Sequence, residues 1–244
     1  MSPVPLVLVA EGTTDRDAIQ QLTRRVLLGE APEWARDGLD ERTLAWSDLL
    51  QWRGLEVDGF TTWPQLTKLL SDRNIRFRRR GGTPAMMEAR KAVVAFELLG
   101  LGGACLIVHR DAGDLQERHP ADFRAAVHDG QAAACAHPVP EIEAWYLCGL
   151  EPQSGAERDA LVEVSTELGF DPARKPSRLR ARSSSPRSVK RVLARLIGAG
   201  SVTRREACLD APLGELAGRD PDTGLGAFLQ AVRAGIAPRV FGRS

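Results

Sequence analysis

The sequence contains three short runs of apolar residues, each followed directly by polar residues. The runs cover residues 5–10 (PLVLVA), 104–109 (ACLIVH) and 131–136 (QAAACA). A short, unbroken apolar run bounded by polar or turn residues is consistent with a strand that is buried on both faces, as in a parallel sheet. The pattern therefore predicts three strands of one parallel sheet.

Segments with helical spacing of apolar residues alternate with these runs. Thr13 or Thr14 is the expected N-cap of a first helix, and we expect further helices over residues 84–99, 120–128 and 141–147. Alternation of strands with helices indicates an α/β fold in which helices cover both faces of a parallel sheet.

The same pattern suggests how the chain is organised. Residues 1–149 are expected to form the α/β domain, with an elaborated region of mixed structure at about 30–82. Residues 150–244 show helical and loop patterns without a convincing strand. We therefore expect a mainly helical C-terminal region.

Composition and charge exclude few classes of protein. The chain of 244 residues has 33 Lys and Arg against 32 Asp and Glu, so its net charge of +1 neither requires nor excludes a polyanionic partner. Its four cysteines are widely spaced and form no C-x-x-C pair, which favours reduced core thiols and a cytoplasmic location. No apolar run is long enough to span a bilayer, so a membrane protein is not expected.

Two acidic turns directly follow predicted strands. One has the sequence E-G-T-T-D at residues 11–15, and the other R-D-A-G-D at residues 110–114. Because the carboxyl ends of parallel strands meet at one edge of a sheet, we expect Glu11 and Asp111 to lie close enough to share a metal ion. Carboxylate oxygens suit Mg²⁺ or Mn²⁺. The alternative is that both turns are solvated, with their acidic residues serving only local turn and helix-start roles.

These turns resemble the Toprim superfamily, whose hallmark is an E-G-x-x-D/E turn after the first strand and a D-x-D turn after a later one. The chain is more closely similar to a bacterial Toprim-like family often associated with anti-phage systems. In that family arginine precedes the acidic turn, and a helix of the pattern E-x-E-A-W-[FY]-L follows, here at residues 141–147. A weaker likeness extends to residues 185–191.

The resemblance implies that Glu11, Asp111 and Asp114 are the catalytic and metal-binding carboxylates, with Glu143 as a further ligand or base. The chain departs from the family pattern because Gly113 stands where the second aspartate is expected. Either Asp114 reaches the metal from a longer turn, or one ligand is missing. For Glu143 the alternative is a favourable charge at a helix N-terminus.

Basic residues form two clusters that could contact phosphate groups. The first comprises Arg73, Arg76, Arg78, Arg79 and Arg80, and the second runs over residues 174–195 with nine Lys and Arg and no Asp or Glu. We assign nucleic-acid contacts to Arg78, Arg79 and Arg80 of the first cluster and to further arginines in the second cluster and the acidic turn. These are Arg110, Arg178, Arg180 and Arg182. The alternative for each cluster is an ordinary solvated face.

The Toprim resemblance implies a metal-dependent nuclease, or a related enzyme that cleaves phosphodiesters in DNA or RNA, acting in bacterial anti-phage defence, and the basic clusters are compatible with such a substrate. The alternative is a non-catalytic Toprim-like module that binds a nucleic acid or a partner protein of a defence system. A homo-oligomer is compatible with either function. A nucleotide-handling phosphotransferase ranks last because the sequence has no phosphate-binding loop.

Overall fold

A parallel sheet is the centre of the computed structural model, which describes residues 2–40, 42–55, 59–77, 84–113, 127, 131–198 and 201–242. The strands run in the order β2-β1-β4-β5, and β3 also pairs with β1. The strands are β1 (Val4–Ala10), β2 (Leu50–Arg53), β3 (Thr61–Thr62), β4 (Cys105–His109) and β5 (Ala133–Ala136). The α/β fold with a parallel sheet, helices around it and C-terminal helices is confirmed.

The chain divides into two units. The sheet unit comprises residues 1–110, 118–136 and 230–244, and the helical unit comprises residues 111–117 and 137–229. The domain division at residue 149 that the sequence suggests stays a prediction.

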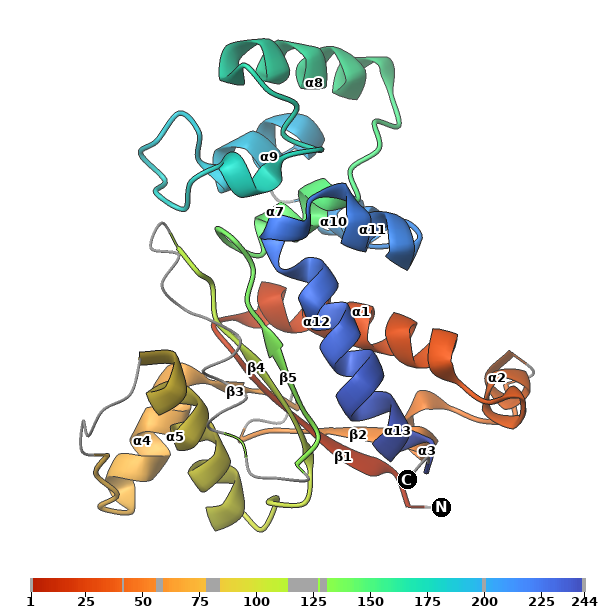
Figure 1. Cartoon of the computed structure of the whole chain (residues 1–244), viewed down its shortest axis with the longest axis vertical. Helices are drawn as coiled ribbons and strands as arrows, with labels where there is room; N and C mark the ends of the chain where they lie inside the picture. The colour runs from red at the N-terminus through yellow and green to blue at the C-terminus, as the bar shows by residue number, and fades with distance from the viewer. Residues whose placement is uncertain are drawn as a thin grey trace. The chain divides into compact units, whose positions relative to one another are not determined.

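Helices cover both faces of the sheet in the sheet unit. Figure 1 shows α4 and α5 on one face and α1 with α13 on the other. The helices of this unit are α1 (Thr13–Glu30), α2 (Glu33–Asp40), α3 (Trp46–Leu49), α4 (Trp63–Asp72), α5 (Pro84–Leu98), a π-helical turn η3 (Val232–Ile236) and α13 (Ala237–Val240). The C-terminal segment of the chain therefore completes the unit that the N-terminal strand begins.

Alternation along the strands explains why both faces need a cover. Val7 and Val9 of β1 and Val108 of β4 belong to the apolar cluster that includes Leu66 of α4. Successive side chains of a strand point to opposite faces, so Leu8, which is fully buried, lies on the other face. Because both faces of the strands are buried, their sequences are continuous apolar runs.

The helical unit has its own core around Trp145, which is fully buried. Its ring stacks on Phe228 with the ring centres 5.3 Å apart, and its indole N–H donates to the carbonyl oxygen of Thr223 at 2.9 Å. The elements of this unit are α7 (Glu143–Cys148), α8 (Gly155–Leu168), η1 (Pro176–Arg178), α9 (Val189–Ile197), α10 (Val202–Cys208), α11 (Leu213–Arg219), η2 (Pro221–Thr223) and α12 (Leu225–Ala231), whose last two residues fall in the sheet unit.

Several local expectations can be compared with this structure. The strands at residues 5–10, 104–109 and 131–136 are confirmed, as is the helix that begins at Pro84. The predicted caps Thr13 and Thr14 are wrong, because α1 already begins at Thr13 and Gly12 is its N-cap. All four cysteines are free thiols. The helix expected over 120–128 lies outside the described residues except for residue 127. No described helix is long and apolar enough to cross a membrane.

Candidate functional site

The ends of β1 and β4 bring the first acidic residue beside an arginine. These strands are parallel neighbours with Val9 opposite Val108, so the residues that follow them, Glu11 and Arg110, leave the sheet at the same edge. The Nε atom of Arg110 lies 3.3 Å from Oε1 of Glu11. The sheet therefore positions Glu11 at a carboxyl edge, where α/β proteins bind ligands.

Arg110 is held by more than one group in the sheet unit. Its Nη2 atom lies 3.6 Å from Oε1 of Glu88 on α5, and its guanidinium carbon lies 5.9 Å from the centre of the Trp63 ring. About a third of the Arg110 side chain is exposed. A phosphate that binds Arg110, as the sequence hypothesis requires, would compete with two carboxylates for this guanidinium.

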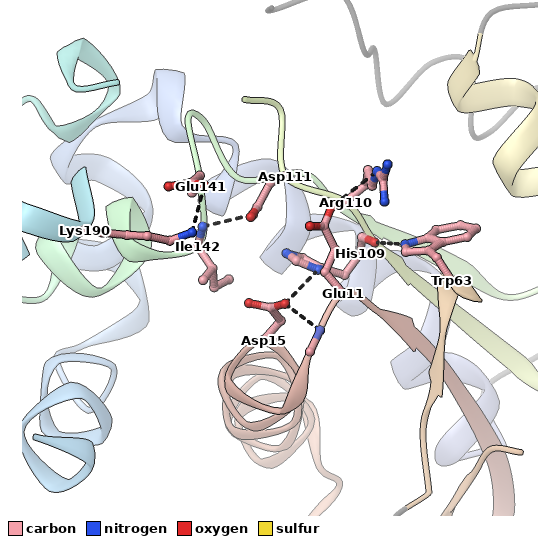
Figure 2. A network of polar contacts seen from close by, with 10 residues as sticks. Glu11, Asp15, Trp63, His109, Arg110, Asp111, Glu141, Ile142 and Lys190 are labelled. Carbon is pink, nitrogen blue, oxygen red and sulfur yellow. Dashed lines mark hydrogen bonds and ion pairs between the residues drawn. The ribbon is translucent and has the colours of Figure 1, made fainter. Parts of the chain in front are cut away.

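Buried polar contacts fix the loop behind Glu11 (Figure 2). Oδ2 of Asp15 accepts a hydrogen bond from the backbone N–H of Gly12 at 2.9 Å and lies 3.8 Å from Nδ1 of His109. His109 is fully buried, and its carbonyl oxygen accepts a hydrogen bond from the Trp63 indole at 3.0 Å. These contacts join the start of α1 to the end of β4, and so they hold the backbone from which Glu11 projects.

The second acidic turn is anchored within the helical unit. Oδ1 of Asp111 accepts a hydrogen bond from the backbone N–H of Ile142 at 3.1 Å. The N–H groups of Ala112 and Gly113 donate to the carbonyl oxygens of Pro138 at 2.9 Å and Pro140 at 2.8 Å. This short ladder fixes the turn against the segment that leads into α7.

Gly113 explains the departure from the D-x-D pattern. Its φ of +66° lies in the left-handed region, which glycine adopts without the penalty that a side chain would carry. An aspartate at this position would adopt the same conformation at a cost that glycine does not carry. The backbone of this turn therefore favours glycine where the family pattern has a ligand.

Glu143, the first residue of α7, is a buried carboxylate of the helical unit. It is only 8% exposed, and its Oε2 atom has no hydrogen-bond partner among the described residues. Burial raises the pKa of this carboxyl to about 7, the negative charges of Glu141 and Asp111 act in the same direction, and Lys190 opposes them. A carboxyl with a pKa near neutrality can both accept and donate a proton under physiological conditions.

Lys190 was not predicted as a site residue, yet it lies beside these carboxylates. Its Nζ atom is 2.9 Å from Oε1 of Glu141, although the two residues are 49 positions apart in the chain (Figure 2). Burial lowers the pKa of Lys190, but the hydrogen bond to Glu141 and the charges of Glu143 and Asp111 outweigh it and raise that pKa. The signal in the sequence was its place in the basic segment and in the stretch 185–191.

The basic residues predicted for nucleic-acid binding fall into two groups. Arg178, Arg180 and Arg182 are exposed in the helical unit, and the Arg178 guanidinium lies 4.5 Å from the centre of the Phe170 ring. Three further arginines and the second aspartate of the acidic turn lie outside the described residues. These are Arg78, Arg79, Arg80 and Asp114.

The predicted metal ligands are oxygen donors of the kind that Mg²⁺ and Mn²⁺ take. Within the described ranges, no group of three or more His, Cys, Asp or Glu side chains gathers closely enough to hold a metal ion. Glu11 belongs to the sheet unit and Asp111 to the helical unit. The expectation that both share one ion therefore stays a prediction.

Comparisons with known proteins give no family for this chain. No protein-family model matches it, and neither does any curated protein or solved structure. The case for a function therefore depends on the residues themselves.

Proposed function

We propose that this protein is a metal-dependent nuclease that cleaves phosphodiesters of DNA or RNA and acts in bacterial anti-phage defence. The main support is the register of β1 and β4, which puts an acidic turn directly after each of two neighbouring parallel strands. Asp111 follows Arg110 in the chain, and Arg110 contacts Glu11. The resemblance of both turns to the Toprim superfamily points to the same chemistry.

In this proposal Glu11, Asp111 and Asp114 would hold Mg²⁺ or Mn²⁺. When bound, such an ion activates water and stabilises charge on the attacked phosphate. Arg110 would bind a phosphate oxygen through its guanidinium, because this group forms bidentate contacts with oxyanions. The ion pairs that Arg110 makes with Glu11 and Glu88 would hold it in place before the substrate binds.

Glu143 is the proposed proton-transfer group. Hydrolysis of a phosphodiester requires that the attacking water lose a proton and that the leaving oxygen gain one. A carboxyl whose pKa is about 7 suits both steps near neutral pH, whereas an ordinary glutamate is almost fully ionised there. Lys190 would position Glu141 and limit how far the pKa of Glu143 rises.

The test is a cleavage assay on DNA and on transfer RNA with added Mn²⁺, comparing the wild type with Glu11→Gln and Glu143→Gln. We expect metal-dependent cleavage by the wild type and a loss of orders of magnitude in Glu11→Gln. Glu97→Gln is a matched control, because Glu97 is an exposed glutamate on α5. Absence of cleavage of either substrate by the wild type would contradict the nuclease proposal.

One observation favours a second candidate, a non-catalytic module that binds a nucleic acid or a protein partner. Glu11 and Glu141 each contact a basic side chain, Arg110 and Lys190 respectively. Such ion pairs neutralise the carboxylates without a metal ion. A purely structural site needs this neutralisation and no metal. In this case Mn²⁺ would change neither cleavage nor stability, while nucleic-acid or protein binding would remain.

A further inference from the structure

A groove with mixed polar and apolar walls lies in the sheet unit between α4, the turn that follows it, and α5. Its volume is about 840 Å³, which is in the range of cavities that hold small organic ligands or parts of larger ones. One of its lining residues, Arg76, belongs to the first basic cluster of the sequence. The groove therefore gives part of that cluster a place in the fold.

One wall is a regular stripe along α4 and the turn after it. Thr67, Leu70 and Ser71 line the groove from one face of α4, since they lie three and four residues apart, and Asn74 lines it from the turn after the helix. Three of these four side chains carry hydroxyl or amide groups, and all three are exposed. This wall offers several hydrogen-bond donors and acceptors above the apolar base formed by the buried Leu70.

The other lining residues add positive charge and an aromatic ring. Arg76 and Lys91 are the basic side chains of the groove, and Phe77 is its aromatic residue. Phe77 is half-buried and packs partly against the core of the sheet unit, so its ring is held in place. Basic groups that track a phosphate backbone, together with an aromatic ring on which a base stacks, are the elements of single-stranded nucleic-acid sites.

Glu88 connects the groove to the candidate site within the same unit. It lines the groove, and its Oε1 atom lies 3.6 Å from Arg110, whose Nε atom lies 3.3 Å from Glu11. Only the Glu88 side chain would thus separate a nucleic-acid strand bound in the groove from the Arg110 guanidinium proposed to bind phosphate. The groove and the arginine proposed to bind phosphate therefore belong to the same unit.

We propose that this groove binds a single-stranded segment of the nucleic acid, with Phe77 stacking on a base and with Arg76 and Lys91 contacting phosphates. The proposal deepens the nuclease function and rests on it, because it names the form of the substrate. A duplex keeps its base faces stacked inside, so the Phe77 ring would have no base to stack on.

The test is fluorescence anisotropy of the full chain with a labelled single-stranded oligonucleotide of about 12 nucleotides, in EDTA so that no cleavage occurs. We expect Phe77→Ala to raise Kd by about fivefold or more, since stacking on an aromatic ring contributes that much per base. Lys91→Gln should raise Kd and lower the slope of log Kd against log salt by about 0.7, the value for one lost phosphate contact on a single strand.

Lys68→Gln is the matched control for the lysine variant. Lys68 lies on α4 but off the groove stripe, is 77% exposed and pairs with Asp72. It should bind the oligonucleotide as the wild type does. Because Lys91→Gln replaces a side chain at the groove rather than one in the core, it keeps the proposal testable if Phe77→Ala impairs folding.

Two results would overturn the groove proposal while leaving the nuclease proposal intact. In the first, the wild type binds the oligonucleotide and the Phe77 and Lys91 variants bind it equally well. In the second, the wild type cleaves a duplex with Mn²⁺ but binds no single strand. Loss of cleavage in Glu11→Gln reports on the nuclease proposal independently, because Glu11 does not line the groove.

Discussion

The two units treat a buried carboxylate at the start of a helix in opposite ways. In the sheet unit, Asp15 in the first turn of α1 is buried and accepts a hydrogen bond from the Gly12 N–H at 2.9 Å. In the helical unit, Glu143 at the start of α7 is equally buried, but its Oε2 atom has no hydrogen-bond partner among the described residues.

This difference concerns the free energy of folding. A buried polar atom with a hydrogen-bond partner stabilises the fold, whereas one without a partner costs free energy that the rest of the unit must offset. Such a cost is typical of residues retained for their chemistry. On this reasoning Asp15 holds the loop that carries Glu11, and the environment of Glu143 fits the proton-transfer role that we propose for it.

The largest expected effect comes from the core of the helical unit. Trp145→Ala should lower the free energy of unfolding by about 3–5 kcal/mol, because it removes a fully buried ring and its stacking on Phe228. Regional hydrogen exchange would show whether protection is lost in the helical unit alone. Trp34→Ala is the control, since Trp34 is 50% exposed and its loss should change stability little. Equal loss of protection in β1 would mean that the two units unfold together, and the comparison between them would fail.

The next effect is the pH dependence that Glu143 should produce. In the unfolded chain the Glu143 carboxyl has the ordinary pKa of 4.5, whereas in the folded protein its pKa is about 7. The folded state therefore holds the extra proton between these values, and its free energy of unfolding falls as the pH rises through this window. The total loss is roughly 3 kcal/mol and levels off above about pH 7.

The variant Glu143→Gln should not show this fall in the free energy of unfolding with rising pH, because its amide does not titrate. Urea unfolding at about pH 5 and about pH 8 should show the variant gaining stability relative to the wild type at the higher pH. Glu97→Gln, an exposed glutamate, should follow the wild type at both values. If Glu143→Gln and the wild type lose stability in parallel as the pH rises, Glu143 does not have a raised pKa and the contrast with Asp15 disappears.

A smaller effect is expected at Asp15. Asp15→Asn keeps the size of the side chain but weakens the charge-assisted hydrogen bond from Gly12, so it should cost about 1–2 kcal/mol. Thermal or urea unfolding near pH 7 measures this change. Asp17→Asn is the control on the same helix, because Asp17 is 52% exposed. If Asp15→Asn were more stable than the wild type, burial of the Asp15 carboxylate would lower the stability of the fold, as we expect for Glu143.

The smallest effect on stability is expected from the exposed arginines of the helical unit. Reversing the charges of Arg178, Arg180 and Arg182 to glutamate should change the free energy of unfolding by no more than about 1 kcal/mol, mostly through lost packing of Arg178 on Phe170. Binding of nucleic acid should weaken and become less dependent on salt. An unchanged salt slope would make this segment a solvated face and leave the groove in the sheet unit as the proposed contact.

The sequence predicts the sheet better than it predicts the site. β1 and β4 are continuous apolar runs because helices cover both faces, so their pattern is readable without a structure. β2 was missed because Leu50–Arg53 is short and its outward residues are polar, which resembles a loop. The region between α1 and α4, which adds β2 and β3 to the sheet, thus has no strong local signal.

For the site, the positions of Glu11 and Asp111 could be predicted because strand ends are visible in the sequence. The surroundings of Glu143 could not be predicted, because they depend on how α9 packs. Its residue Lys190 forms a hydrogen bond with Glu141, which lies 49 positions earlier in the chain. The unpartnered Oε2 atom is likewise a property of packing. Local spacing identifies which carboxylates end a strand, but not which of them the core leaves without a hydrogen bond.

The measurement that tests the central claim most directly is the change in Tm on adding Mn²⁺ to the wild type, Glu11→Gln and Asp111→Asn. If these carboxylates hold the ion, Mn²⁺ at about 100 times its Kd should stabilise the wild type by about 2.7 kcal/mol, and both variants should gain clearly less. Without metal the neutral asparagine should fold as well as aspartate. An equal rise in Tm for all three proteins would contradict the account, because neither residue would then be a metal ligand.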